Sequence, residues 1–151
     1  MQTVASPVTI LRRNTGIQKR ILLISDHLES ASVLSSRVKV LYNCKVTVAY
    51  DLFEAINLLS SNCFDLIVVD WYFSTLNCEQ VLDFIESNFK GSSLKYKTIP
   101  LVYLSETQAN RKTNLVTKHL KHVGYINKIQ PISNIVHYLK FYLTDSNDLL
   151  N

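Results

Sequence analysis

Three continuous runs of aliphatic and β-branched residues, each ending in a polar side chain, constrain the fold of this chain more than any other feature. They span residues 21–26, 64–70 and 99–105 and end at Asp26, Asp70 and Ser105. A shorter run over residues 124–128 ends at Lys128. Runs of this kind are typical of strands that are buried on both faces, as in a parallel sheet.

The segments between these runs have the periodicity of helices and of one further strand. In residues 28–42, the apolar side chains of Ala31, Leu34, Val38 and Leu41 have the spacing of an amphipathic helix. Further helices are predicted at 52–61 after an Asp51 N-cap, at 78–89, at 108–122 and from Pro131 to Leu143, and a strand at 45–50. Short helical crossovers imply parallel strands. The prediction is an α/β fold, a doubly wound five-stranded parallel sheet in a three-layer sandwich.

The length of 151 residues fits one domain. Residues 1–19 lack a sustained period and are predicted to be a flexible N-terminal extension, residues 20–143 the domain, and residues 144–151 a C-terminal tail. No apolar stretch approaches the roughly 18 residues that a membrane span needs. The three cysteines are widely spaced, without a C-x-x-C pair, which fits reduced thiols. We therefore expect a cytoplasmic protein with no membrane partner.

The modest net charge of +4 does not identify a nucleic-acid partner. Basic residues gather on the predicted helix at 108–122, namely Arg111, Lys112, Lys118 and Lys121. A basic face can bind nucleic acid, but no DNA-reading motif accompanies this one, so such binding is not predicted. His119 and His122 could share a face of the same helix, but no cysteine or acidic ligand lies nearby, so a zinc site is not predicted either.

The polar residues that close the apolar runs are predicted to meet. In a parallel α/β sheet, the functional site lies outside the carboxyl ends of the strands. Asp26, Asp70, Ser105 and Lys128 would therefore lie together at one edge, as two carboxylates, a hydroxyl and an amine. This set of groups serves phosphoryl chemistry on an aspartate.

Over residues 20–143, the chain resembles the receiver domain of two-component response regulators. In that family, one strand ends in two acids, one in the phosphoryl-accepting Asp, one in Ser or Thr, and one in Lys. Here these positions are Ser25-Asp26, Asp70, Ser105 and Lys128, with supporting matches at Ile99-Pro100 and Gly124-Tyr125. The resemblance implies the flavodoxin-like fold of receiver domains.

The resemblance also implies roles for these residues. Asp70 would attack the phosphorus of a phosphohistidine on a histidine kinase or phosphotransfer protein. Lys128 would pair with one phosphoryl oxygen, and the Ser105 hydroxyl would donate to another. Tyr125 matches the aromatic residue that changes rotamer when that hydroxyl is drawn inward. Such a protein is a phosphoacceptor in signalling and not an enzyme, with slow self-dephosphorylation at most.

The implied cofactor is Mg²⁺, because attack by a carboxylate on a phosphoryl group brings anions together. By resemblance, the ligands would be Asp26, Asp70 and the backbone carbonyl of Tyr72, all of them oxygens, which Mg²⁺ prefers. Ser25 replaces the first of the family's two adjacent acids. Losing such a group typically weakens metal binding about 10–100-fold.

The departures from the family pattern leave two hypotheses open. Glu106 stands where the family usually has a small residue, and Ile129 replaces the proline that follows the lysine. The four matching residues favour a single-domain response regulator in a two-component or phosphorelay system. Ser25, Glu106 and Ile129 favour a pseudo-receiver, a protein-interaction module that keeps the fold without being phosphorylated. A receiver cut from a larger kinase or transcription factor is a third, weaker hypothesis.

The last predicted helix presents a candidate partner surface. Its buried face is predicted to consist of Ile132, Ile135, Val136, Leu139 and Leu143. Tyr138 and Phe141 lie off that face and are predicted to be exposed. Aromatic residues are enriched at interfaces. A downstream protein or a second copy of the chain would therefore bind through Tyr138 and Phe141.

Overall fold

The computed structural model describes residues 18–70, 76–88, 98–106 and 115–143, and within them five parallel strands form one sheet. The strands are β1 (Arg20–Ser25), β2 (Lys45–Ala49), β3 (Leu66–Asp70), β4 (Ile99–Ser105) and β5 (Leu120–Asn127). Their order across the sheet is β2-β1-β3-β4-β5. The predicted α/β class and parallel five-stranded sheet are therefore confirmed.

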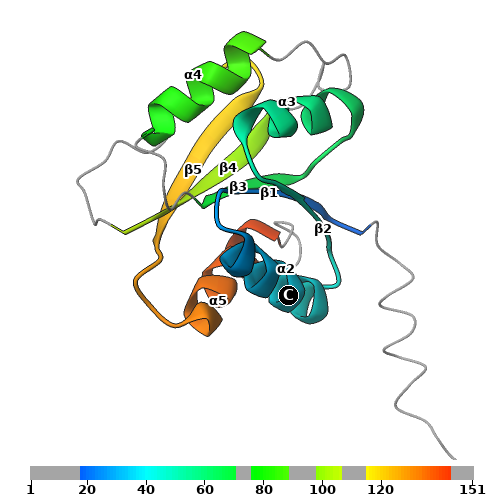
Figure 1. The fold of residues 1–151 in the computed structure, drawn as a ribbon, viewed down its shortest axis with the longest axis vertical. Coiled ribbons are helices and arrows are strands. Elements are labelled where there is room, and N and C mark those ends of the chain that lie inside the picture. The colour runs from blue at the N-terminus through cyan, green and yellow to red at the C-terminus, as the bar shows by residue number, and fades with distance from the viewer. Residues whose placement is uncertain (1–17, 71–75, 89–97, 107–114, 144–151) are drawn as a thin grey trace, which may run out of the picture.

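Four helices within the described residues cover the two faces of the sheet, which makes three layers. They are α2 (Leu28–Tyr42), α3 (Leu52–Ser61), α4 (Cys78–Asn88) and α5 (Ile132–Leu143). Figure 1 shows α3 and α4 on one side of the sheet and α2 and α5 on the other. No helix in this part of the chain is long and apolar enough to cross a membrane. The three cysteines are free thiols.

Local hydrogen bonds at the helix starts explain why the helices begin where they do. As predicted, Asp51 caps α3, since its Oδ1 accepts from the Glu54 amide at 2.7 Å. At the start of α4, Asn77 and Gln80 each accept at 2.9 Å from the backbone N–H of the other, which is a capping box. At the start of α2, Nδ1 of His27 accepts from the Ser30 amide at 3.1 Å. These caps satisfy N–H groups that the helices leave free.

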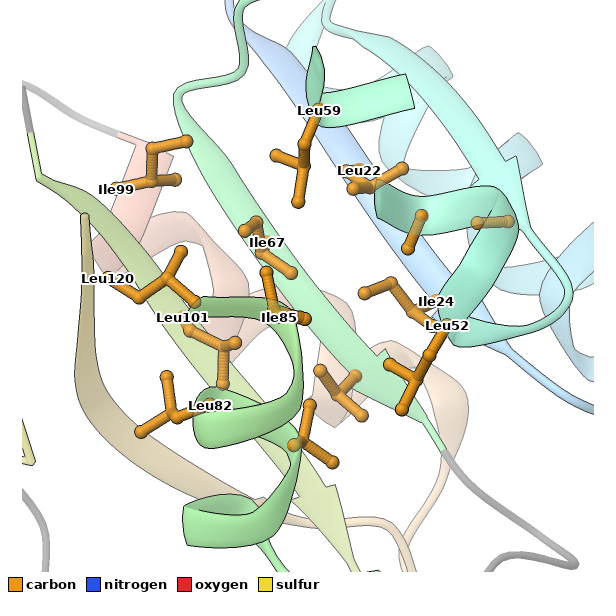
Figure 2. Packing of buried hydrophobic residues seen from close by; sticks show 14 of the residues in the cluster. Leu22, Ile24, Leu52, Leu59, Ile67, Leu82, Ile85, Ile99, Leu101 and Leu120 are labelled. Atoms are coloured by element: carbon orange, nitrogen blue, oxygen red, sulfur yellow. The ribbon is translucent and has the colours of Figure 1, made fainter. Parts of the chain in front are cut away.

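Strand β3 lies at the centre of the core, and all five of its residues are buried. On one face, Leu22, Ile67 and Leu101 of the sheet pack against α3 and α4, as Figure 2 shows. The helices contribute side chains that include Leu52, Leu59, Leu82 and Ile85. On the other face, Ile21, Leu23 and Val68 pack against α2 and α5. A strand enclosed on both faces explains the continuous apolar run that preceded Asp70 in the sequence.

The prediction of a helix at 108–122 is wrong for residues 115–122, the part that the structure describes. Residues 107–114 lie outside the described residues, residues 115–119 are not helical, and β5 already begins at Leu120. Leu120, His122, Gly124 and Ile126 are the buried positions of this strand, which alternate with more exposed ones. Lys118 and Lys121 are both exposed, but they do not form a stripe along a helix. His119 and His122 likewise do not share a helix face.

Glu86 in the last part of α4 anchors the connection that enters β5. Its Oε2 accepts from the Thr117 hydroxyl at 3.0 Å and from the His119 amide at 3.3 Å. Its Oε1 lies 2.8 Å from Nδ1 of His119. Three contacts from one carboxylate thus fix residues 117–119 against α4, where the sequence pattern suggested the end of a helix.

Smaller differences concern single residues. Leu41 is 64 % exposed and does not belong to the buried face of α2, whose inward side chains are Ala31, Leu34, Ser35 and Val38. The last helix begins at Ile132, one residue after the predicted start, and the Pro131 carbonyl accepts from the Asn134 amide at 2.9 Å. Phe89, predicted to close the buried face of α4, lies outside the described residues.

Alanine substitutions of two leucines on α2 should have very different effects on stability. Leu34 is only 2 % exposed, so Leu34→Ala leaves a cavity and should lower the free energy of unfolding by about 2–5 kcal/mol. Leu41→Ala removes an exposed side chain and should change it by less than about 0.5 kcal/mol. Urea denaturation of the two variants measures both values. Equal losses would mean that Leu41 belongs to the core and that α2 is rotated.

Candidate functional site

The polar residues that close the strands lie at one edge of the sheet. Ser25 at the end of β1 is in register with Asp70 at the end of β3. Ser105 ends the neighbouring strand β4, and the first residue after β5 is Lys128, whose amide donates to the Ser105 carbonyl at 2.9 Å. The structure therefore brings Asp70, Ser105 and Lys128, three of the four groups predicted to meet, to the same edge.

Asp70 is buried, 2 % exposed, and each of its carboxylate oxygens has a donor. Nζ of Lys128 lies 3.3 Å from Oδ1. The Ser30 hydroxyl, from the first turn of α2, donates to Oδ2 at 3.2 Å. The Lys128 side chain is itself only 6 % exposed, so the ion pair is nearly shielded from water.

Opposing influences act on the Asp70 carboxyl. Burial is the largest and raises its pKa, since an apolar surrounding disfavours the charged form. Lys128, and then the Ser30 hydrogen bond, act in the opposite direction, and the negative charge of Asp26 adds to the increase. The pKa of Asp70 is raised overall. The folded state therefore holds the Asp70 proton more tightly than the unfolded chain does. Through Asp70, the fold becomes less stable as pH rises from the ordinary pKa of an aspartate to the raised pKa of Asp70.

The hydroxyl of Ser25, the residue that replaces an acid, is engaged by the backbone. Ser25 is fully buried, and its Oγ lies 3.3 Å both from the amide of His27 and from the carbonyl of His27. This hydroxyl therefore bridges the N–H and the C=O of His27, directly before α2 begins. With an uncharged side chain at this position, Asp26 and Asp70 remain as the two carboxylates of the predicted metal site.

The donor set partly fits the implied Mg²⁺. Asp26 and Asp70 are close enough to interact electrostatically, and both offer the hard oxygens that this cation prefers. Tyr72, the third predicted ligand, lies outside the described residues. Among the residues that the structure describes, no group of three or more His, Cys, Asp or Glu side chains could hold a metal. Two carboxylates are enough for a weak site that keeps several waters.

Tyr125 lies in β5 within an aromatic cluster. Its ring packs edge-on against Tyr103 at 5.9 Å and against His122 at 4.4 Å between centroids. The side chain is partly buried, and Ser105 is 6 % exposed at the end of the adjacent strand. Glu106 and Ile129, the two other departures from the family pattern, are both exposed. The switch role of Tyr125 and Ser105 stays a prediction.

The exposed side of α5 borders a cleft. As predicted, Tyr138 and Phe141 are exposed, whereas Ile135, Val136 and Leu139 are buried. The cleft has a volume of about 430 Å³ and is lined by Tyr125, Ile126, Asn127, Ile129, Gln130, Tyr138, Phe141 and Tyr142. The Tyr142 hydroxyl lies directly over Gly124, where a Cβ atom would collide with it.

Ser30 is the site residue that the sequence did not reveal. It belongs to the third position of α2, and its side chain points back to the end of β3. The available signal was a hydroxyl four residues after Asp26, one turn into a helix that starts at the sheet edge. Such a residue can reach the strand ends, but the apolar pattern gives no reason to select it.

Many of the solved structures that this fold matches are receiver domains. The receiver domain of Francisella response regulator 1452 matches with 18 % identity and a TM-score of 0.60, over 83 % of this chain and 97 % of its own. A response regulator receiver domain protein from Bacillus halodurans matches with 18 % identity and a TM-score of 0.60, over 85 % of this chain and all of its own. The receiver domain of the hybrid histidine kinase CckA gives 17 % identity, a TM-score of 0.55, and coverage of 83 % and 99 %.

No protein-family sequence model matches the chain, and no curated protein sequence does either. The likeness is therefore one of structure, and it confirms the receiver-type, flavodoxin-like fold that the motifs implied.

Replacing Lys128 should destabilise the fold in a pH-dependent way. In Lys128→Met, the buried Asp70 charge loses its cation, which should lower the free energy of unfolding by roughly 3–5 kcal/mol near neutral pH. The substitution raises the Asp70 pKa further, so the loss should shrink as pH falls and the carboxylate becomes protonated. Urea denaturation at about pH 7 and about pH 5 measures this difference.

Lys121→Met is the matched control, because Lys121 lies on β5 but is exposed. It should cost little at either pH. A Lys128→Met loss that is small, or that grows towards acid pH, would contradict the ion pair.

Proposed function

We propose that this chain is a receiver-type phosphoacceptor of a two-component or phosphorelay system, which takes a phosphoryl group on Asp70 and signals through protein contacts. The donor would be the phosphohistidine of a histidine kinase or phosphotransfer protein. The observation that carries the proposal is the buried Asp70–Lys128 pair at the carboxyl edge of the sheet, beside Ser105 and Asp26. The proposal includes a cytoplasmic location, which free cysteines suit.

The chemistry follows from these side chains. A carboxylate oxygen of Asp70 forms the bond to phosphorus while the phosphorus–nitrogen bond of the phosphohistidine breaks, and the imidazole leaves. Lys128 already lies 3.3 Å from the nucleophile and can neutralise a phosphoryl oxygen as the phosphoryl group is transferred to Asp70. The hydroxyl of Ser105 is a second donor at the same edge. The acceptor is consumed in each event, so we propose a signalling domain and not an enzyme.

Asp26 and Asp70, with the backbone carbonyl of Tyr72, would hold Mg²⁺, which supplies the positive charge that brings carboxylate and phosphoryl group together. Binding should be weaker than in a site with three acids, because Ser25 is uncharged.

A pseudo-receiver that binds partners without phosphorylation is the second candidate function. The specific observation in its favour is that Ser25 uses its hydroxyl to hold the backbone of His27 in place of a charged metal ligand. The two functions differ in one property, the ability of Asp70 to accept a phosphoryl group.

Incubation with acetyl phosphate and Mg²⁺ should add one phosphoryl group to the wild-type protein and none to Asp70→Asn. Intact-mass measurement detects the adduct directly. Asp83→Asn, which changes an exposed aspartate of α4, is the control and should react like the wild type. Equal responses of wild type and Asp70→Asn would rule out the phosphoacceptor and leave the pseudo-receiver.

The partner surface that we propose is the cleft beside α5. Tyr138 and Phe141, which are 47 % and 59 % exposed, line this cleft together with Tyr125 of β5. Lys140 and His137 are also exposed on this helix, which has no acidic residue. Aromatic residues beside positive charge suit a protein partner or a second copy of the chain. Because Tyr125 lines this cleft, it would link the cleft to the Asp70 site.

The double variant Tyr138→Ala, Phe141→Ala should weaken association without unfolding the protein, since both side chains are exposed. Sedimentation over a range of concentrations measures self-association, and pull-down measures binding to a candidate histidine kinase or output protein. Phe53→Ala is the control, because Phe53 is 69 % exposed on the opposite side of the sheet. Unchanged association in both assays would leave α5 with a structural role only.

A further inference from the structure

The second hydrogen-bond donor to Asp70 is Ser30, which belongs to helix α2 and not to the end of a strand. The Lys128 amine holds Oδ1, and the Ser30 hydroxyl holds Oδ2 at 3.2 Å. The carboxylate is 2 % exposed, so water has little access to either oxygen. Ser30 therefore holds Oδ2, while Lys128 holds Oδ1.

Ser30 is held in place by a short chain of hydrogen bonds that begins at Ser25. The Ser25 hydroxyl contacts both peptide groups of His27, each at 3.3 Å. The His27 ring accepts from the Ser30 amide at 3.1 Å, which fixes the first turn of α2. Through these contacts, the residue that replaced an acid contributes to the position of the hydroxyl that reaches Asp70.

We propose that Ser30 is a positioning residue that fixes the Asp70 carboxylate through Oδ2 and competes there with an incoming divalent cation. The second half of this proposal rests on the proposed function, in which Asp70 is a ligand of Mg²⁺. The first half does not depend on it.

The competition has a simple chemical basis. Mg²⁺ binds carboxylate oxygens at about 2.0–2.1 Å and takes electron density from them. In this proposal the cation takes the lone pair of Oδ2 to which the Ser30 hydroxyl now donates, so the hydroxyl turns away as the cation binds. The hydrogen bond that is lost opposes metal binding, and a net contribution of roughly 1 kcal/mol corresponds to about a fivefold change in affinity.

Three serine variants separate this role from a merely structural one. Ser30→Ala removes the hydroxyl, Ser30→Thr keeps it, and Ser32→Ala changes an exposed serine of the same helix. The first readout is the ¹³Cγ resonance of Asp70 at constant pH without metal. The second is the Mg²⁺ affinity, from a titration followed by amide resonances at the sheet edge. Urea denaturation shows that each variant is folded.

Ser30→Ala should move the Asp70 resonance and tighten Mg²⁺ binding about three- to tenfold. Ser30→Thr and Ser32→Ala should leave both near the wild-type values. An unmoved Asp70 resonance in Ser30→Ala would overturn the positioning role. Unchanged or weaker Mg²⁺ binding in Ser30→Ala would overturn the competition, and weaker binding would mean that the hydroxyl supports the metal site. If neither wild type nor Ser30→Ala binds Mg²⁺, the proposed cofactor and the competition both fail, and the Asp70 resonance still decides the positioning role.

Discussion

Enclosure of β3 on both faces is the constraint on which the rest of this structure depends. Its side chains take part in both hydrophobic clusters, so the strand places its last residue, Asp70, at the edge of the core with almost no contact with water. A carboxylate in such a place is costly unless it is paired and hydrogen-bonded. Lys128, directly after β5, and Ser30 of α2 supply those partners, and the site is therefore assembled by the same packing that holds the layers together.

Much of this arrangement could be predicted because the signals are local. The helix at residues 28–42 and the helix at 52–61 have the boundaries that their apolar spacing and the Asp51 cap indicated. Parallel strands end at one edge, so the meeting of Asp70 with Lys128 followed from the order of the runs alone. The chemistry of the edge was thus accessible from the sequence before any contact was known.

The rest depended on contacts between segments far apart in the chain. In β5, two of the inward positions are His122 and Gly124, which do not count as apolar, so the alternation was hidden. Three contacts to Glu86 hold residues 117–119 against α4, and a sequence pattern does not show such a partner 31–33 residues away. Ser30 was missed for the same reason, because its role lies in a hydrogen bond to a residue 40 positions further along.

The contact between Gly124 and Tyr142 affects the shape of the cleft beside α5. A methyl group at position 124 would collide with the Tyr142 hydroxyl, so the Tyr142 side chain would have to shift, and this side chain lines the cleft together with Tyr138 and Phe141. The position of one side chain that lines the cleft therefore depends on a buried position of the edge strand. In this fold, the space offered to a partner can be changed while every side chain that the partner touches keeps its identity, which separates the shape of a binding surface from its chemistry.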